Sequence, residues 1–117
     1  MIEDQGVNIM SDTIAAVATA NAVSAIGIVR LSGDDAIEIV SRVFTPYFGA
    51  DLKTAESRKL YMGKLCDKNG SVIDECLCTV SRAPSSYTGE NTAEFQCHGS
   101  PTVLRSALDA LFSAGAR

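Results

Sequence analysis

The stretch TAEFQCHGSPTVLRSALDALF, residues 92–112, predicts a β-strand that runs directly into an α-helix. Apolar and polar residues alternate over Thr92–His98, as they do in a strand with one buried face. The apolar residues of that face are Ala93, Phe95 and Cys97. Gly99 interrupts the alternation, and Ser100 followed by Pro101 is typical of a helix start. The helix then carries one apolar stripe, formed by Val103, Leu104, Ala107, Leu108, Leu111 and Phe112.

Upstream, the sequence predicts two strands and a helix. The strands are Thr13–Thr19, rich in small apolar residues, and Ile26–Ser32, rich in β-branched residues. Ser32 with Asp35 three residues later resembles a capping box, which would begin the helix. The helix has an apolar face of Ala36, Ile37, Ile39, Val40, Val43 and Phe44, and Pro46 ends it.

Between these two units lie two further predicted strands, Arg58–Asp67 and Ser71–Ala83. Lys68-Asn69-Gly70 joins them as a hairpin, because Asn-Gly favours tight turns. The element order is therefore β-β-α-β-β-β-α. Strands outnumber helices, which favours an α+β fold with a mixed, mostly antiparallel five-stranded sheet and two main helices packed on one face.

Length and composition indicate one globular domain. The 117 residues are 46% hydrophobic and 21% charged, and we assign residues 1–11 to a flexible leader and 12–117 to the domain. The net charge of -4 argues against general binding of nucleic acid. The longest uncharged stretch, Thr13–Val29, is too polar and short to span a membrane, and the N-terminus is not a secretory signal. We expect a cytoplasmic protein with no membrane association.

The four cysteines, Cys66, Cys76, Cys78 and Cys97, have no C-x-x-C spacing. Zinc sites usually draw their thiolates from such knuckles, so we expect buried thiols and no metal site. Cys97 shares a face with Phe95, which favours burial in the core, and no base–nucleophile pair in the sequence requires Cys97 to be catalytic. The sequence also lacks a phosphate-binding G-x-x-x-x-G-K-[ST] motif and a nucleophile elbow. We therefore assign no catalytic residue to this chain.

Two polar segments are candidate binding sites. In Ser85–Asn91, Tyr87 can stack on a flat ligand, Gly89 allows close approach, and Glu90 can accept two N–H donors side by side. An ordinary hairpin connection explains the same composition. In Gln96–Pro101, the start of the helix favours an anion, and His98 is available for proton chemistry or hydrogen bonding. A histidine that only caps the strand end is the alternative there.

Four segments occur in the order typical of one family: DTIAA at 12–16, IGIVRLSG at 26–33, APSSYTGEN at 83–91 and CHG at 97–99. Together they resemble the N-terminal domain of the tRNA modification GTPases called MnmE or TrmE. The resemblance extends from Met10 to Arg117.

This resemblance implies a fold similar to half of the folate-binding region of the glycine-cleavage aminomethyltransferase. It implies binding of a reduced folate, 5-formyl- or methylene-tetrahydrofolate, and homodimerisation through this domain. The helical domain and the GTPase domain, with GTP, Mg and K, would lie outside this chain. The whole protein would modify the wobble uridine of tRNA with a flavin-dependent MnmG- or GidA-type partner.

The resemblance also places the folate pocket near the residues that match the family segments: Tyr87, Thr88, Gly89, Glu90, Cys97, His98 and Gly99. Glu90 would anchor the pterin through its two carboxylate oxygens. Arg30 or Arg105 would hold the glutamate tail through its positive charge.

One stretch departs from the family pattern. Where the family has Pro-Pro-Gly-Arg-Gly-Gly, this chain has Ala20–Ala25, and Val23 replaces the arginine. The departure favours a first alternative, a dimerisation module that has lost folate. A second alternative is an enzyme fragment related to the aminomethyltransferases, which would need a second half-domain.

Overall fold

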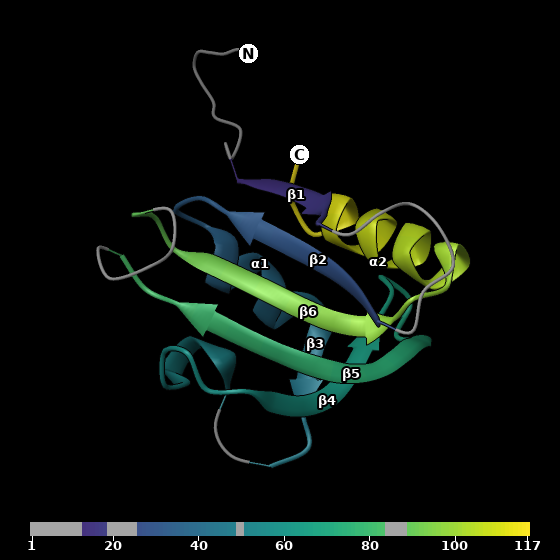
Figure 1. The fold of residues 1–117 in the computed structure, drawn as a ribbon, viewed down its shortest axis with the longest axis horizontal. Helices are drawn as coiled ribbons and strands as arrows, with labels where there is room; N and C mark the ends of the chain where they lie inside the picture. Colours follow the sequence, from purple (N-terminus) through teal and green to yellow (C-terminus); the bar gives the residue numbers. More distant parts are fainter. Residues whose placement is uncertain (1–12, 19–25, 49–50, 84–88) are drawn as a thin grey trace.

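The computed structural model describes residues 13–18, 26–48, 51–83 and 89–117. In this part of the chain, strands form one sheet in the order β1-β2-β6-β5-β4-β3, and each neighbouring pair is antiparallel (Figure 1). The strands are β1 (Ile14–Val17), β2 (Ile26–Ser32), β3 (Phe44–Pro46), β4 (Tyr61–Cys66), β5 (Val72–Ser81) and β6 (Thr92–His98). The helices are α1 (Ala36–Val43), the short 3₁₀ helix η1 (Leu52–Thr54) and α2 (Pro101–Ser113). The α+β class is confirmed.

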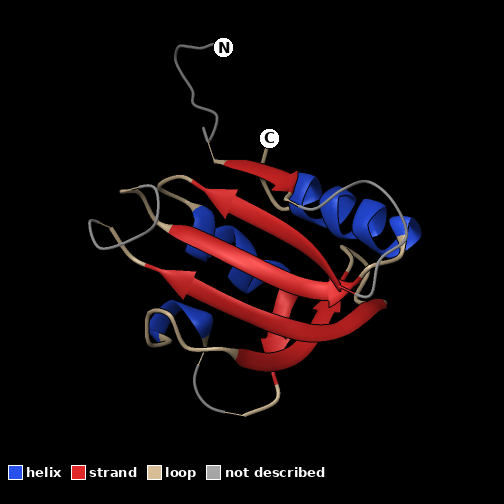
Figure 2. Ribbon diagram, viewed as in Figure 1, coloured by secondary structure: helices blue, strands red, loops and turns tan. Residues whose placement is uncertain are grey.

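Both main helices pack on one face of the sheet, which we call the covered face. Figure 2 shows α1 behind the strands, and α2 contacts both α1 and the strands. The alternation of β6 is confirmed, since its apolar residues Ala93, Phe95 and Cys97 are at most 3% exposed. The opposite face of the sheet, which we call the open face, carries half-buried or exposed side chains from the same strands. In the described residues no helix is long and apolar enough to cross a membrane.

The prediction of five strands was wrong by one, because α1 is shorter than its apolar pattern indicates. Phe44 continues the helical stripe in sequence, yet its backbone is extended and it begins β3. The proline at 46 disfavours helical geometry for the residue before it, and Phe44 is still buried, with its ring 5.7 Å from that of Phe95. β3 also needs Gly63 opposite Pro46, since a Cβ at Gly63 would overlap the Thr45 carbonyl oxygen.

The predicted capping box was also wrong. Asp35 is the N-cap of α1, but no side-chain capping bond is present there. Instead the Asp35 amide donates to the hydroxyl of Thr13, 3.1 Å away, and Thr13 is buried beside β1. Ser32 cannot begin the helix because Gly33, with φ of 147°, turns the chain between them.

The predicted hairpin turn is confirmed. Asn69-Gly70 closes the β4–β5 hairpin, where the Asp67 carboxylate accepts from the amides of Asn69 and Ser71. Gly115, with φ of 122°, follows the end of α2, and the Ala116 amide donates to the Leu111 carbonyl, a Schellman arrangement.

Candidate functional site

At one end of the open face, charged residues of β2 and β6 form a pair across the strands. Arg30 lies opposite Glu94 in the register, and its Nε and Nη2 donate to the Glu94 carboxylate at 3.0 and 2.8 Å. The two side chains are 39% and 22% exposed. An ion pair as exposed as this contributes about 0–1 kcal/mol to stability. Its main effect is to hold a guanidinium group and a carboxylate at fixed positions on the open face.

Glu90 joins this pair from the loop before β6. The Ser32 hydroxyl donates to the Glu90 carboxylate at 3.1 Å, and Ser32 is two residues from Arg30 on the same face of β2. Gly89 has φ of 81°, and no atom of the described residues lies within 4 Å of where its Cβ would be. Arg30, Ser32, Glu90 and Glu94 therefore form one polar row, which we call the Glu90 row.

Asn91 positions the Glu90 row, and sequence reasoning did not single it out. Its side-chain oxygen accepts from the Ala83 amide at 2.9 Å, and its side-chain nitrogen donates to the Asp34 carbonyl at 3.2 Å. Its own carbonyl accepts from the Gly33 amide. Asn91 thus ties the two sides of the loop before β6 to the β2–α1 turn. The tendency of Asn to bond nearby backbone was the available signal.

At the opposite end of β6, a second polar arrangement surrounds His98. The Asp74 carboxylate accepts from the His98 amide at 2.9 Å, and its other oxygen lies 2.7 Å from His98 Nδ1. The His98 side chain is 75% exposed, whereas that of Asp74 is only 10% exposed. The carboxylate therefore fixes the orientation of an exposed imidazole ring.

Among the predicted pocket residues that the structure describes, Glu90 and His98 lie far apart within one chain. Glu90 precedes β6 and His98 ends it, and seven residues of strand span roughly 20 Å. The Cys97 side chain points into the covered face, where it is 3% exposed, and Gly99 is buried. Two separate polar groups result. One is the Glu90 row, and the other is the pair of Asp74 and His98, which we call the His98 end. We use the term half-site for each of these groups.

Other predicted residues lie elsewhere. Arg105 is exposed on α2, in the layer that packs on the covered face, so it does not share a surface with Arg30. Tyr87, Thr88 and the segment Ala20–Ala25 lie outside the described residues.

The cysteines are free thiols. A hydrogen bond with Cys97 and burial both raise the pKa of the Cys76 thiol, and the Asp74 carboxylate adds to the shift. Burial raises the pKa of Cys78. In the metal-free chain these two thiols therefore stay protonated, and a protonated thiol is a poor nucleophile.

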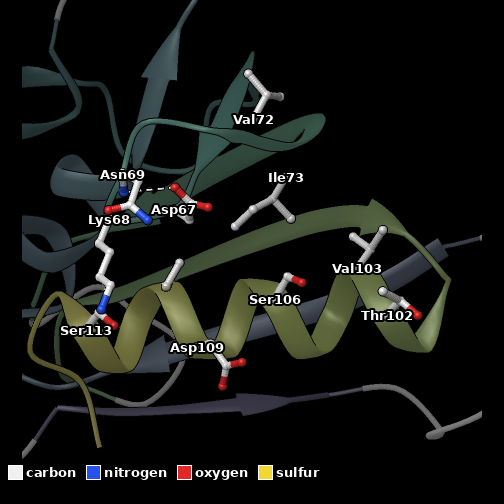
Figure 3. A pocket seen from close by; sticks show the side chains of 11 residues that line it. Asp67, Lys68, Asn69, Val72, Ile73, Thr102, Val103, Ser106, Asp109 and Ser113 are labelled. Carbon is white, nitrogen blue, oxygen red and sulfur yellow. Dashed lines mark hydrogen bonds between the residues drawn. The ribbon is translucent and has the colours of Figure 1, made fainter.

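Two of the hollows among the described residues bear on the site. A groove of about 530 Å³ lies between the β4–β5 hairpin and α2, lined by residues such as Asp67, Lys68, Ser106 and Asp109 (Figure 3). It mixes both charge signs and contains none of the predicted site residues. A smaller hollow of about 280 Å³ lies on the open face, and its lining residues are Ile26, Met62, Glu75, Cys76, Leu77, Gln96, Cys97 and His98. The His98 end therefore borders an apolar depression on the same face that carries the Glu90 row.

Comparison with known proteins gives a consistent family. A model of the family described as "GTP-binding protein TrmE N-terminus" matches residues 13–117. The tRNA modification GTPase MnmE of Thermoanaerobacter pseudethanolicus is 43% identical over 107 residues, which cover 91% of this chain and 23% of that protein. The MnmE of Syntrophomonas wolfei is 46% identical and that of Thermus thermophilus 45%, each over 92% of this chain and 24% of the relative. The chain thus spans about a quarter of the length of the curated relatives it matches. It belongs to the TrmE N-terminal family, as its fold and its four matching segments indicate.

Proposed function

We propose that this chain is the folate-binding and dimerisation domain of a tRNA modification GTPase. The observation that carries the proposal is the open face, which combines the Glu90 row with an apolar hollow in a chain of the TrmE N-terminal family. Such a face, uncovered by either main helix, offers both a ligand surface and a contact surface.

The ligand is a reduced folate, 5-formyl- or methylene-tetrahydrofolate. Its aminopyrimidine edge offers two adjacent N–H donors, and the Glu90 carboxylate can accept both. Arg30, two residues from Ser32 on β2, supplies positive charge for the carboxylates of the glutamate tail. Glu94 holds Arg30 in place before the tail arrives.

The dimer contact is the apolar part of the open face. Ile26 and Met62 are 57% and 46% exposed, and Leu77 lies between their strands, directly opposite Met62 in the register. A two-fold dimer uses the same patch on both copies. Two sheets packed with opposite strand directions would bring the Glu90 row of one chain to the His98 end of its partner. This arrangement would reunite the matched segments that one chain keeps apart.

The relatives' names describe tRNA modification GTPases, and they support a proposal for the whole protein. We propose that a protein containing this domain hydrolyses GTP, with Mg and K, through a further domain. We also propose that it modifies tRNA wobble uridine with a flavin-dependent MnmG-type partner. The 117 residues contain no phosphate-binding loop motif, so this chain's part is ligand binding and assembly.

A second candidate is a dimerisation module without folate. The specific observation in its favour is the replacement of the family's Arg/Gly-rich loop by Ala20–Ala25. In this case the apolar hollow keeps its role and the Glu90 row has none.

Calorimetric titration with 5-formyl-tetrahydrofolate, run with a parallel mass determination, separates the two. The folate proposal expects saturable binding by a dimer. The same titration of Glu90→Gln tests the Glu90 row. Its matched control is Glu56→Gln, which removes a carboxylate that is 78% exposed and outside the Glu90 row. A folded dimer that shows no binding would reject folate and leave the assembly role.

A further inference from the structure

Three metal-ligating side chains meet where β5 and β6 begin to separate. A carboxylate oxygen of Asp74 and the Sγ atoms of Cys76 and Cys97 all lie within 4.8 Å of one another. Cys76 and Cys97 are each 3% exposed, so this cluster is buried and is not a surface group of acids.

The strand register explains how residues distant in sequence come together. Leu77 pairs with Gln96 and Cys78 with Phe95, which places Cys76 directly opposite Cys97 on the covered face. Asp74, two residues before Cys76, lies on the same side of β5. Spacing along the sequence does not reveal this cluster, because its members come from two adjacent strands.

The Asp74 carboxylate is the third ligand of this cluster. Its side chain is only 10% exposed, and in the described residues its side-chain partner is His98 and not a lysine or arginine. Each of its oxygens contacts His98 once, so each keeps a lone pair that a cation can use. Cys78 is buried on the same strand and lies outside the cluster, so burial of a thiol alone does not require an acid beside it.

We propose that Asp74, Cys76 and Cys97 form a binding site for one thiophilic divalent cation such as Zn²⁺. Two thiolates neutralise the charge of the ion. Tetrahedral zinc with bonds of about 2.3 Å to sulfur and about 2.1 Å to oxygen needs ligand atoms roughly 3.3–3.8 Å apart. The cluster must therefore contract by no more than about 1.5 Å.

Hydrogen bonds hold the ligands in place before an ion arrives. Asp74 accepts from the His98 amide at 2.9 Å and its other oxygen lies 2.7 Å from His98 Nδ1, which orients the carboxylate. Three protein ligands leave a fourth coordination position for water. The side chains of Cys76 and Cys97 are buried, but Asp74 also contacts His98, which belongs to the proposed folate surface, so zinc binding is tested in the absence of folate.

The test is titration of the reduced, metal-free chain with Zn²⁺ in competition with a chromophoric chelator, with native mass spectrometry for the stoichiometry. We expect one ion per chain. Cd²⁺ in place of Zn²⁺ should give the near-ultraviolet absorption of a metal–thiolate bond. Cys97→Ala and Cys76→Ala should each weaken binding by at least about a hundredfold.

Cys78→Ala is the matched control, since it removes a buried thiol of the same strand from outside the cluster and should leave the affinity unchanged. Asp74→Asn keeps an acceptor for the His98 amide, so it tests the site in a chain that still folds, and we expect a loss of roughly tenfold or more. Circular dichroism confirms that each variant is folded. Absence of Zn²⁺ binding under reducing conditions, or binding that survives both cysteine substitutions, would overturn the proposal.

Discussion

The two ends of β6 present polar groups of different kinds. Before Thr92, the Glu90 carboxylate is exposed and is bonded by the hydroxyl of Ser32 at 3.1 Å. At the other end, the Asp74 carboxylate is nearly buried and contacts both the amide and the ring of His98. An exposed carboxylate can rearrange around a ligand at little cost, whereas a buried one is fixed in advance. One strand therefore joins an adaptable half-site to a rigid one.

The middle of β6 connects these ends and should give the largest effect. Phe95 is fully buried and its ring packs on that of Phe44. We expect Phe95→Ala to lower the free energy of unfolding by about 3–5 kcal/mol and to disturb both half-sites. Urea unfolding measures this, with Phe48→Ala as control, because Phe48 is 85% exposed. Equal losses in the two variants would contradict the packing described.

The second-largest effect is expected at the rigid end of β6, where Asp74 contacts His98. Asp74→Asn removes the charge from the hydrogen bonds to His98, and we expect a loss of about 1–3 kcal/mol in the free energy of unfolding of the metal-free chain. Glu90→Gln, the matching change at the adaptable end, should cost less than about 0.5 kcal/mol because the side chain is exposed. Thermal unfolding of both variants checks the contrast, and a larger loss for Glu90→Gln would reverse it.

Glu90→Gln should have little effect on stability but a large effect on folate affinity. Glu90→Gln replaces one accepting oxygen by a donor, so a charge-assisted contact worth about 1.5–3 kcal/mol is lost. We expect a decrease in affinity for 5-formyl-tetrahydrofolate of roughly ten- to a hundredfold by calorimetry. If the affinity of Glu90→Gln equals that of the unchanged chain, Glu90 does not anchor the pterin.

The smallest effect concerns Arg30 and Glu94. A double-mutant cycle with Arg30→Gln and Glu94→Gln should give a coupling energy of about 0–1 kcal/mol, since both side chains are partly exposed. Chemical denaturation in low and high salt measures it, and the coupling should shrink as salt rises. A coupling well above this range would show that the pair is a structural element and not a ligand-positioning one.

The sequence predicted those features that depend on neighbouring residues. Alternation located β6, and Asn69-Gly70 marked a turn that the structure contains. Features that depend on distant residues were missed. β3 has three residues and a proline, too little for a periodic pattern, and the acceptor for the Asp35 amide comes from Thr13 on another element.

The candidate site divides in the same way. The residue types of Glu90, Arg30 and His98 suggested binding. Only the strand register shows that Arg30 lies near the Glu90 end of β6 and that His98 lies at the other end. Spacing within the sequence also does not reveal that Cys76 and Cys97 face each other across β5 and β6.

The most direct test of the account is subunit complementation. The claim is that a second copy joins the Glu90 row of one chain to the His98 end of the other. Glu90→Gln and His98→Ala chains, each weak in folate binding alone, are unfolded together, refolded as a mixture and titrated with 5-formyl-tetrahydrofolate, with the mass measured alongside. Random pairing gives heterodimers with one intact site each, so about a quarter of all sites should regain the original affinity. A mixture that binds no better than its separate components, or an unchanged chain that binds folate as a monomer, would contradict the account.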